Sequence, residues 1–335
     1  MGDTNGDIKV SVYCLAYNHG KYIRNALKGL VKQRTNFRYE VFVHDDASTD
    51  NTAEIIREYA EKYPDIIRPI YQTENQYSKG VKIMPTYILP KMSGRYIAVC
   101  EGDDFWTDDD KLQLQVDALE AHPECAVCHA KVDRTDVQGN IIGLPLPPVE
   151  IKSGVIKSKD YLALVAYAGP CQTLTFQLSG AMMRKDIYEE YIENKPGYAK
   201  MFRAGDIPMF LYMGMKGDAF YINRSMSCYR TGNPESFVGR MGGSAEKKIK
   251  HYEAESDALR AFDEYSGFIV HEAIENGIKN RRFSILRATH DIPAMRSREM
   301  RAMYRSLPIK ARFKEWLCCY FPWVMQIMGK LKKHS

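Results

Sequence analysis

The sequence predicts an α/β fold with a mostly parallel central sheet, flanked by helices and followed by a helical C-terminal appendage. Three apolar segments with strand character, residues 9–17, 39–43 and 96–100, each lead into a cluster of polar side chains. Strands that alternate with helices form parallel sheets, and such sheets bind ligands beyond the carboxyl ends of their strands. The three polar clusters are therefore expected to meet at one edge of the sheet.

The first two segments predict β-turn-α units. Residues 9–17 read as a buried strand that runs into a polar turn, after which apolar residues recur at helical spacing over 23–31. Residues 39–43 read as a second strand that ends in the polar segment 44–50, and a helical stripe follows until Pro64. A third strand is expected at 66–71.

The segment 94–104 places three carboxylates at the end of a fourth strand. An apolar run bounded by glycines ends in Glu101, Asp103 and Asp104. Carboxylates crowded in this way raise one another's pKa unless a cation neutralises them, so the arrangement suits Mg²⁺ or Mn²⁺ bound together with a phosphorylated ligand. A solvated acidic turn is the alternative interpretation.

Taken together, residues 10–22, 41–52 and 94–106 resemble the inverting glycosyltransferases of family 2. That family has the GT-A fold and uses nucleotide-activated sugars, and its motifs appear here in the family's order as Ala-Tyr-Asn, Asp-Asp-Ala-Ser-Thr-Asp and Glu-Gly-Asp-Asp. Two residues depart from the family pattern. Ala47 replaces the usual glycine, from which we expect a turn that avoids the most strained φ values. Glu101 replaces an aspartate, which leaves its contact with a metal open.

The resemblance implies a role for each motif residue in binding a nucleotide-sugar. Backbone groups of Ala16 and Tyr17 and the Asp46 carboxylate would hold the base and ribose, with Asp45 in support, and an acid that accepts a ring N–H favours a UDP-sugar. Asp103, with Glu101, would ligate Mn²⁺ or Mg²⁺ at the diphosphate. The remaining assignments are Asp104 to the sugar or a metal-bound water, Lys79 to phosphate or sugar, Arg230 to the diphosphate, and Asn18 to the donor pocket. For Lys79 a solvated lysine is the alternative, and for Asn18 a turn that satisfies its own backbone groups.

An inverting transfer also needs a base, because the acceptor hydroxyl must lose its proton during a single in-line displacement. Asp206 stands before a helical run and matches the family element that carries the base. The alternative is an N-cap aspartate. The Gln-x-x-Arg-Trp motif of processive members is absent, so we expect one sugar per encounter. The glycine-rich segment 231–244 reads as a lid or a flexible linker.

The C-terminal region is basic and interrupted by an apolar run. Residues 296–335 contain ten Lys or Arg but only two acidic residues, Glu299 and Glu315, in a chain of 335 residues whose net charge is +5. The apolar run 316–328 is too short to span a bilayer, which takes about 20 residues. It suits contact with an anionic membrane surface, and a helix packed on the body is the alternative. We expect a nucleotide-sugar-binding half over 1–115, an acceptor-binding half over 116–240 and a helical region over 241–335.

The cysteines indicate a reducing compartment. Cys125 and Cys128 precede His129 in a pattern that also attaches haem, but buried thiols are the better interpretation. Eight cysteines without framework spacing, and a polar start at residues 1–7, favour the cytoplasm, including the inner face of the plasma membrane. The expected acceptor is a glycan or polyprenyl-linked lipid in the synthesis of a surface polysaccharide such as capsule or lipopolysaccharide.

Other function classes fit the sequence less well. A sugar-nucleotide nucleotidyltransferase would want a glycine-rich phosphate loop near the first strand, where this chain has Ala-Tyr-Asn-His-Gly. A non-catalytic nucleotide-sugar-binding protein would have no need of Asp206. The sequence contains no nucleic-acid-binding motif, so nucleic acid is not an expected partner.

Overall fold

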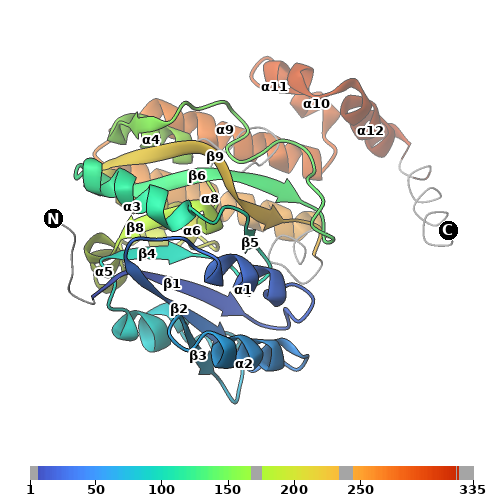
Figure 1. The fold of residues 1–335 in the computed structure, drawn as a ribbon. Coiled ribbons are helices and arrows are strands. Elements are labelled where there is room, and N and C mark those ends of the chain that lie inside the picture. Colours follow the sequence, from blue (N-terminus) through green and yellow to red (C-terminus); the bar gives the residue numbers. More distant parts are fainter. Residues whose placement is uncertain (1–6, 167–175, 234–243, 322, 324–335) are drawn as a thin grey trace. The chain divides into compact units, whose positions relative to one another are not determined.

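The computed structural model describes residues 7–166, 176–233, 244–321 and 323. It divides into two compact units (Figure 1), one with the described residues within 1–165, 174–196 and 204–233, the other with those within 166–173, 197–203 and 234–335. The expected three-part division at 115 and 240 stays a prediction. Most of the predicted lid and the end of the basic tail lie outside the described residues.

The first unit is built on a mixed, mostly parallel sheet, and the predicted α/β fold is confirmed. Its strand order is β3-β2-β1-β4-β8-β6-β9-β5, and β7 pairs with β9. The strands β1 to β4 are parallel, and β8 lies antiparallel between β4 and β6. The bounds are β1 Ile8–Ala16, β2 Arg38–Asp45, β3 Ile67–Tyr71, β4 Tyr96–Val99, β5 Phe105–Trp106, β6 Cys125–Thr135, β7 Gly154–Ile156, β8 Ala181–Arg184 and β9 Asp218–Arg230.

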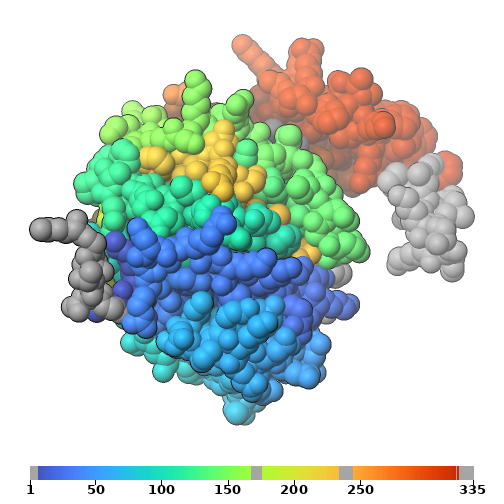
Figure 2. All heavy atoms as spheres, viewed as in Figure 1, coloured from blue at the N-terminus to red at the C-terminus, as the bar shows by residue number. Residues whose placement is uncertain are grey.

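Helices cover both faces of this sheet. Figure 1 shows α1 (Ile23–Val31), α2 (Thr52–Lys62) and α3 (Lys111–Ala121) on the face toward the viewer, with α5 (Lys185–Glu193) and α6 (Asp206–Lys216) behind it. In the space-filling view of Figure 2, the blue residues of β1 to α2 and the green residues of α3 and β6 form a continuous packed surface. The apolar stripe of α1 is buried, as its helical spacing predicts. The helix α4 spans Ser158–Ala166.

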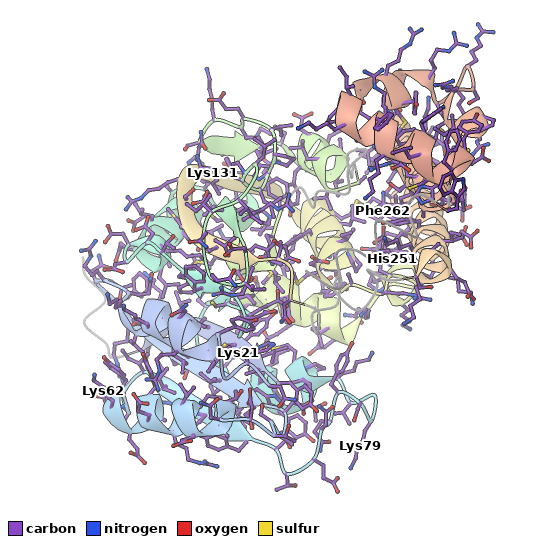
Figure 3. The ribbon with its side chains drawn as sticks, turned by 90° about the vertical axis from the view of Figure 1, so that its right-hand side faces the viewer. Lys21, Lys62, Lys79, Lys131, His251 and Phe262 are labelled. Carbon is purple, nitrogen blue, oxygen red and sulfur yellow. The ribbon has the colours of Figure 1, made fainter. Side chains whose placement is uncertain are left out.

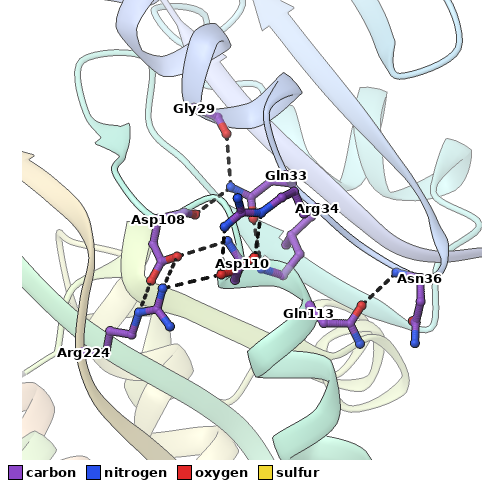
Figure 4. A network of polar contacts seen from close by, with 9 residues as sticks. Gly29, Gln33, Arg34, Asn36, Asp108, Asp110, Gln113 and Arg224 are labelled. Atoms are coloured by element: carbon purple, nitrogen blue, oxygen red, sulfur yellow. Dashed lines mark hydrogen bonds and ion pairs between the residues drawn. The ribbon is translucent and has the colours of Figure 1, made fainter.

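A polar network ties the end of α1 to the start of α3 and to β9 (Figure 4). The Gln33 amide donates to the carbonyls of Gly29 and Asp108, and its oxygen accepts the N–H of Leu112. The Asp108 carboxylate pairs with the Arg224 guanidinium at 2.5 Å. This network fixes the chain just after the acidic segment 101–104, so that segment leaves the sheet edge in a defined direction.

The last strand of the sheet, β9, is continuous over 13 residues, although the polar residues 223–225 interrupt its apolar pattern. It runs parallel to β6 with two register shifts between Ala130 and Val132. Bulges of this kind let a strand continue past an irregularity, even where the apolar pattern of its sequence is interrupted.

The second unit is a set of helices joined by buried polar contacts. Its long helices are α8 (Ala245–Tyr265) and α9 (His271–Ala288), and α10 (Ile292–Met295), α11 (Arg301–Ser306) and α12 (Ile309–Tyr320) follow. The buried Arg281 guanidinium donates to Glu255 at 2.8 Å, which satisfies both charges between α8 and α9. Phe262 and His251, labelled in Figure 3, are buried residues of α8. In the described ranges, no helix is long and apolar enough to cross a membrane.

The turn after β2 corrects the expectation for Ala47. Its φ is 60°, in the left-handed region, and not in the relaxed region that we expected. The turn cannot relax because Ser48 is held on both sides: its N–H is donated to Asp45 at 3.3 Å, and its hydroxyl accepts the N–H of Asn18 at 2.9 Å. Asn18, with φ of 54°, in turn accepts the N–H of Thr49 at 2.8 Å. Two left-handed residues therefore interlock the turns after β1 and β2.

We predict that Ala47→Gly stabilises the protein by up to about 1 kcal/mol, because glycine adopts the left-handed conformation without the steric cost that alanine meets there. Chemical denaturation of both proteins measures the change. Ala53→Gly in α2 is the matched control and should destabilise by about 0.5–1 kcal/mol. Equal losses in the two variants would contradict the left-handed turn.

The buried Lys111 is expected to make the free energy of unfolding depend on pH. Its Nζ donates to Gln115 at 2.6 Å and lies 4.3 Å from the centre of the Trp106 ring, and burial lowers its pKa to about 7. In the unfolded chain a lysine titrates at about 10.4. Between these values the unfolded state binds more protons, so stability falls as the pH is lowered from 10 to 7, by at most about 1.4 kcal/mol per pH unit.

Lys111→Met should remove this slope and raise the free energy of unfolding at pH 7. Urea unfolding at pH 7, 8 and 9 measures it, with the exposed Lys28→Met as the control that keeps the slope. The interpretation of Lys111 as a neutralised buried amine is wrong if its variant keeps the wild-type slope.

Candidate active site

The three polar clusters meet at the carboxyl edge of the sheet. Asp45 lies opposite Ala16 in the register of β1 and β2, and the N–H of Asp46 is donated to the Ala16 carbonyl at 3.0 Å. From the other side of β1, the N–H of Gly102 is donated to the Leu15 carbonyl at 3.0 Å. The segments 15–18, 45–48 and 100–104 are thus brought together by backbone hydrogen bonds.

The two aspartates after β2 have different surroundings. Both carboxylate oxygens of Asp46 accept backbone N–H groups of the loop after β3, from Gln76 at 2.8 Å and Tyr77 at 3.0 Å. Asp45 is equally buried, and its Oδ1 has no hydrogen-bond partner in the described part of the chain. A buried acceptor without a donor costs about 1–3 kcal/mol, so Asp45 is the acid at which a ligand N–H would be stabilising.

The other residues predicted for the donor pocket differ in their burial and in their hydrogen-bond or ion-pair partners. Ala16 is buried at the end of β1, and the Tyr17 ring is partly exposed. The Asn18 side chain serves the interlocked turns, in line with the alternative given for it. Lys79, on the loop labelled in Figure 3, forms an ion pair with Glu74 rather than with the acidic cluster.

The acidic segment is crowded and largely buried. Burial, followed by the charge of Asp103, raises the pKa of Asp104 to about 8. Burial also raises the pKa of Glu101 well above its ordinary range, and the charges of Asp104, Asp103 and Asp206 raise it further. The effect of Asp206 on Glu101 means that a carboxylate from α6 reaches this cluster, although more than 100 residues separate the two in the sequence.

A short element before β8 holds two of these acids. The Ser179 hydroxyl donates to Asp104 Oδ2 at 2.6 Å, and the Gln177 amide lies within 3.4 Å of both Asp104 and Glu101. The Gln177 oxygen in turn accepts the Ser179 N–H at 2.5 Å. Sequence reasoning missed both residues. Their only signal was a polar pair directly before the apolar strand at 181–183.

Arg230 is buried at the end of β9 beside the same segment. Its backbone N–H is donated to Asp104 Oδ1 at 3.0 Å. Its guanidinium donates to the backbone carbonyls of Asp103 at 2.8 Å and Val137 at 2.9 Å. The guanidinium also lies 4.7 Å from the centre of the Tyr22 ring. Its Nη2 is buried with no partner among the described residues, which leaves the two N–H groups of this nitrogen for an anion.

Asp206 is the first residue of α6, and Gly205 occupies the N-cap position. Its side chain accepts the adjacent Ile207 N–H at 2.9 Å and is partly exposed. Besides Glu101, its charge acts on the hydroxyl groups of Tyr13, Tyr191 and Tyr229, whose pKa values are raised mainly by burial. Asp206 therefore lies among aromatic residues at the rim of the acidic cluster.

The oxygen donors present fit a divalent cation that a ligand helps to bind. No group of three or more His, Cys, Asp or Glu within the described residues is arranged to hold a metal by itself. Asp104 uses both carboxylate oxygens within the protein, so Glu101 and Asp103 are the two hard oxygen ligands that the segment has to offer. Mg²⁺ and related ions are commonly held by one or two carboxylates together with substrate phosphates.

The cysteines of the predicted haem-like pattern belong to the core. Cys125 and Cys128 are both buried in β6, and His129 Nε2 lies 2.8 Å from the Tyr161 hydroxyl. Burial lowers the pKa of His129 to about 3, so this histidine is neutral at physiological pH.

One curated relative and two solved structures resemble this chain. A relative from Mycobacterium tuberculosis, an uncharacterised protein, is 48% identical over 119 residues, which cover 36% of this chain and only about a third (34%) of the relative. The structure of Staphylococcus aureus TarS 1–349 in complex with UDP has a TM-score of 0.53 at 17% identity, over 85% of this chain and 92% of TarS 1–349. The mannosyltransferase PcManGT of Pyrobaculum calidifontis, in complex with GDP-Man and Mn²⁺, has a TM-score of 0.54 at 17% identity, over 97% of this chain and 86% of PcManGT.

The two structures share the fold of this chain, a GT-A-like sheet flanked by helices. The sequence model of glycosyl transferase family 2 matches residues 11–192, more than half of the chain and all three motifs. The chain therefore belongs to glycosyltransferase family 2.

Proposed function

We propose that the protein transfers a sugar from a nucleotide-sugar, with a UDP-sugar favoured, to a hydroxyl group of a glycan or polyprenyl-linked acceptor. The transfer inverts the anomeric centre, depends on Mn²⁺ or Mg²⁺ and adds one sugar per encounter. The observation that carries this proposal is that Asp206, at the start of α6, lies near enough for its charge to raise the pKa of Glu101, at the sheet edge where Asp45 and Asp103 also lie. TarS bound to UDP and PcManGT bound to GDP-Man with Mn²⁺ are consistent with such a donor.

Asp45 is the residue proposed to bind the uracil ring of the nucleotide, in place of Asp46, which the sequence favoured. Asp46 already accepts two backbone N–H groups, whereas Asp45 Oδ1 is buried without a donor. A uracil ring presents one N–H to such an acceptor, and backbone groups of Ala16 and Tyr17 lie on the neighbouring strand end. Lys79 is left out of this proposal because of its pair with Glu74.

Glu101 and Asp103 are the proposed metal ligands. A divalent cation bound there would offset the charge of the donor's diphosphate and of the nucleoside diphosphate that leaves. To ligate the metal, Asp104 would have to lose its hydrogen bonds with Ser179 and Arg230. Its proposed role is therefore to fix the acidic segment and, at most, to contact the sugar. The proposed partner of the unpartnered Arg230 Nη2 is the diphosphate of the donor.

Asp206 is the proposed base. In a single displacement the acceptor oxygen attacks the anomeric carbon, its proton passes to the Asp206 carboxylate, and the bond from that carbon to the diphosphate oxygen breaks. The attack opposite the leaving group inverts the centre. The N-cap of α6 is Gly205, and Asp206 accepts the Ile207 N–H in the first turn, a role that an asparagine at this position could also fill.

The acceptor is the least defined part of the proposal. Residues 136–150 return antiparallel to β6 beside the end of β9, where Arg230 contacts Val137. Four aliphatic side chains of this loop are exposed, Ile141, Ile142, Leu144 and Val149. Apolar side chains on a loop that Arg230 joins to the acidic segment favour an acceptor with a lipid part, as in the synthesis of a surface polysaccharide at the cytoplasmic face of a membrane.

We predict that Asp103→Ala abolishes both Mn²⁺-dependent UDP binding and sugar transfer, because the diphosphate would face Glu101 and Asp104 without a bound cation. Calorimetric titration with UDP, with and without Mn²⁺, measures binding apart from catalysis. Asp65→Asn, at an exposed position in the turn before β3, is the control and should bind normally. Full transfer in excess EDTA would show that no metal is needed.

We predict that Asp206→Asn lowers transfer by roughly 10²–10⁴-fold, because the amide cannot accept the acceptor's proton. UDP affinity and melting temperature should stay at wild-type values. Asp160→Asn, which removes an acid from the first turn of α4, controls for the loss of a helix N-terminal charge. Near wild-type transfer by Asp206→Asn would exclude it as the base, and slow donor hydrolysis by the wild type would separate an enzyme from a non-catalytic binder.

A further inference from the structure

One side of α12 is anchored in the second unit. Trp316, Ala311 and Cys319 pack on an apolar cluster that includes Phe283, Met295 and Tyr304. The only acid of the helix, Glu315, is buried and accepts from Arg287 at 3.1 Å, and it lies 2.7 Å from His290 Nδ1. These contacts fix which side of α12 packs inward.

The other side of α12 carries large apolar side chains into solvent. Ile309 is 76% exposed, Phe313 58% and Tyr320 50%. Their spacings of four and seven residues place them on one face of the helix. The partly buried Trp316 borders this face, with its ring centre 5.9 Å from that of Phe313 and 6.0 Å from that of Tyr320. Phe321 and Trp323, directly after the helix, are also exposed. Such a concentration of exposed aromatic residues is unusual for a surface that meets only water.

The exposed charged side chains of α11 and α12 are positive. Lys310 and Lys314 are exposed on α12 itself, and Arg301 and Arg305 are exposed on α11. From residue 300 to the end of the sequence Glu315 is the only acid, and it faces inward. Within the described residues no salt bridge involves these four cations.

We infer that this face of α12, defined by Ile309, Lys310, Phe313, Lys314 and Tyr320, binds the surface of an anionic lipid bilayer. Aromatic and aliphatic side chains gain by entering the boundary between headgroups and acyl chains, and lysines beside them are attracted by anionic lipid. A polyanion such as nucleic acid offers the lysines a partner but leaves the apolar side chains in water. A helix of 12 residues is about 18 Å long, so it lies on a bilayer whose hydrocarbon core is about 30 Å thick.

This inference deepens the proposed function, because a lipid-linked acceptor resides in a membrane, and it is tested with neither donor nor acceptor present. The full-length protein is floated with vesicles of phosphatidylcholine alone and of phosphatidylcholine mixed with phosphatidylglycerol. We expect partition onto the anionic vesicles that weakens as salt is raised. Equal partition onto both vesicle types, or none onto either, would overturn the inference.

Two pairs of substitutions separate the apolar and charged contributions. Lys310→Gln with Lys314→Gln should weaken partition roughly tenfold or more, since each lysine near an anionic surface contributes about a factor of five. Ile309→Ser with Phe313→Ser should weaken it at least as much, because two apolar side chains no longer enter the interface. All four residues are exposed, so the melting temperature should be unchanged.

Matched controls lie outside α12. Lys28→Gln with Lys32→Gln removes two exposed lysines at the same spacing from α1 and the residue after it, and Phe268→Ser with Ile269→Ser removes two exposed apolar side chains from the turn between α8 and α9. Both controls should partition like the wild type. If they weaken partition as much as the α12 variants do, then binding is not specific to this face. Loss of partition with wild-type sugar transfer to a soluble acceptor leaves the proposed function standing.

Discussion

The crowding of carboxylates at one sheet edge is the constraint on which the rest of the first unit depends. Glu101, Asp103, Asp104 and Asp206 lie close enough that their charges raise the pKa of Glu101. The fold holds them together with neutral donors, the Ser179 hydroxyl, the Gln177 amide and the Arg230 N–H. The Arg230 guanidinium donates to the backbone carbonyls of Asp103 and Val137, and its charge opposes the rise in the pKa of Asp104 that burial and Asp103 cause.

Arg230 also links the acidic segment to the loop over 136–150. One guanidinium spans the carbonyls of Asp103 and Val137, while β6 and β9 run parallel up to the pair formed by Thr135 and Arg230. The proposed metal-binding turn and the aliphatic loop are therefore positioned by the same buried side chain. A shift of the turn over 101–104 is therefore expected to move the loop over 136–150 as well, because close-packed interiors transmit displacements.

The sequence predicts the parts of this site that lie next to strand ends. The apolar runs before Asn18, Asp45 and Glu101 are continuous, so the mostly parallel sheet and the meeting of the three clusters follow from the pattern of residues. Gln177 and Ser179 could not be predicted, because they reach the cluster only through the antiparallel insertion of β8 between β4 and β6. The left-handed Ala47 was also missed, since its conformation is imposed by hydrogen bonds from the turn after β1.

The paired aspartates divide two tasks that a sequence pattern cannot separate. In each pair the second residue uses both carboxylate oxygens to hold groups that are distant in the sequence: Asp46 accepts the backbone N–H groups of Gln76 and Tyr77, and Asp104 accepts the Ser179 hydroxyl and the backbone N–H of Arg230. An asparagine has a single acceptor oxygen and could not accept on both sides. The second aspartate must therefore be an acid for structural reasons, while the first, Asp45 or Asp103, is the one proposed to meet the ligand. Two acids side by side look equivalent in the sequence, and only their hydrogen bonds reveal which of them the scaffold has already satisfied.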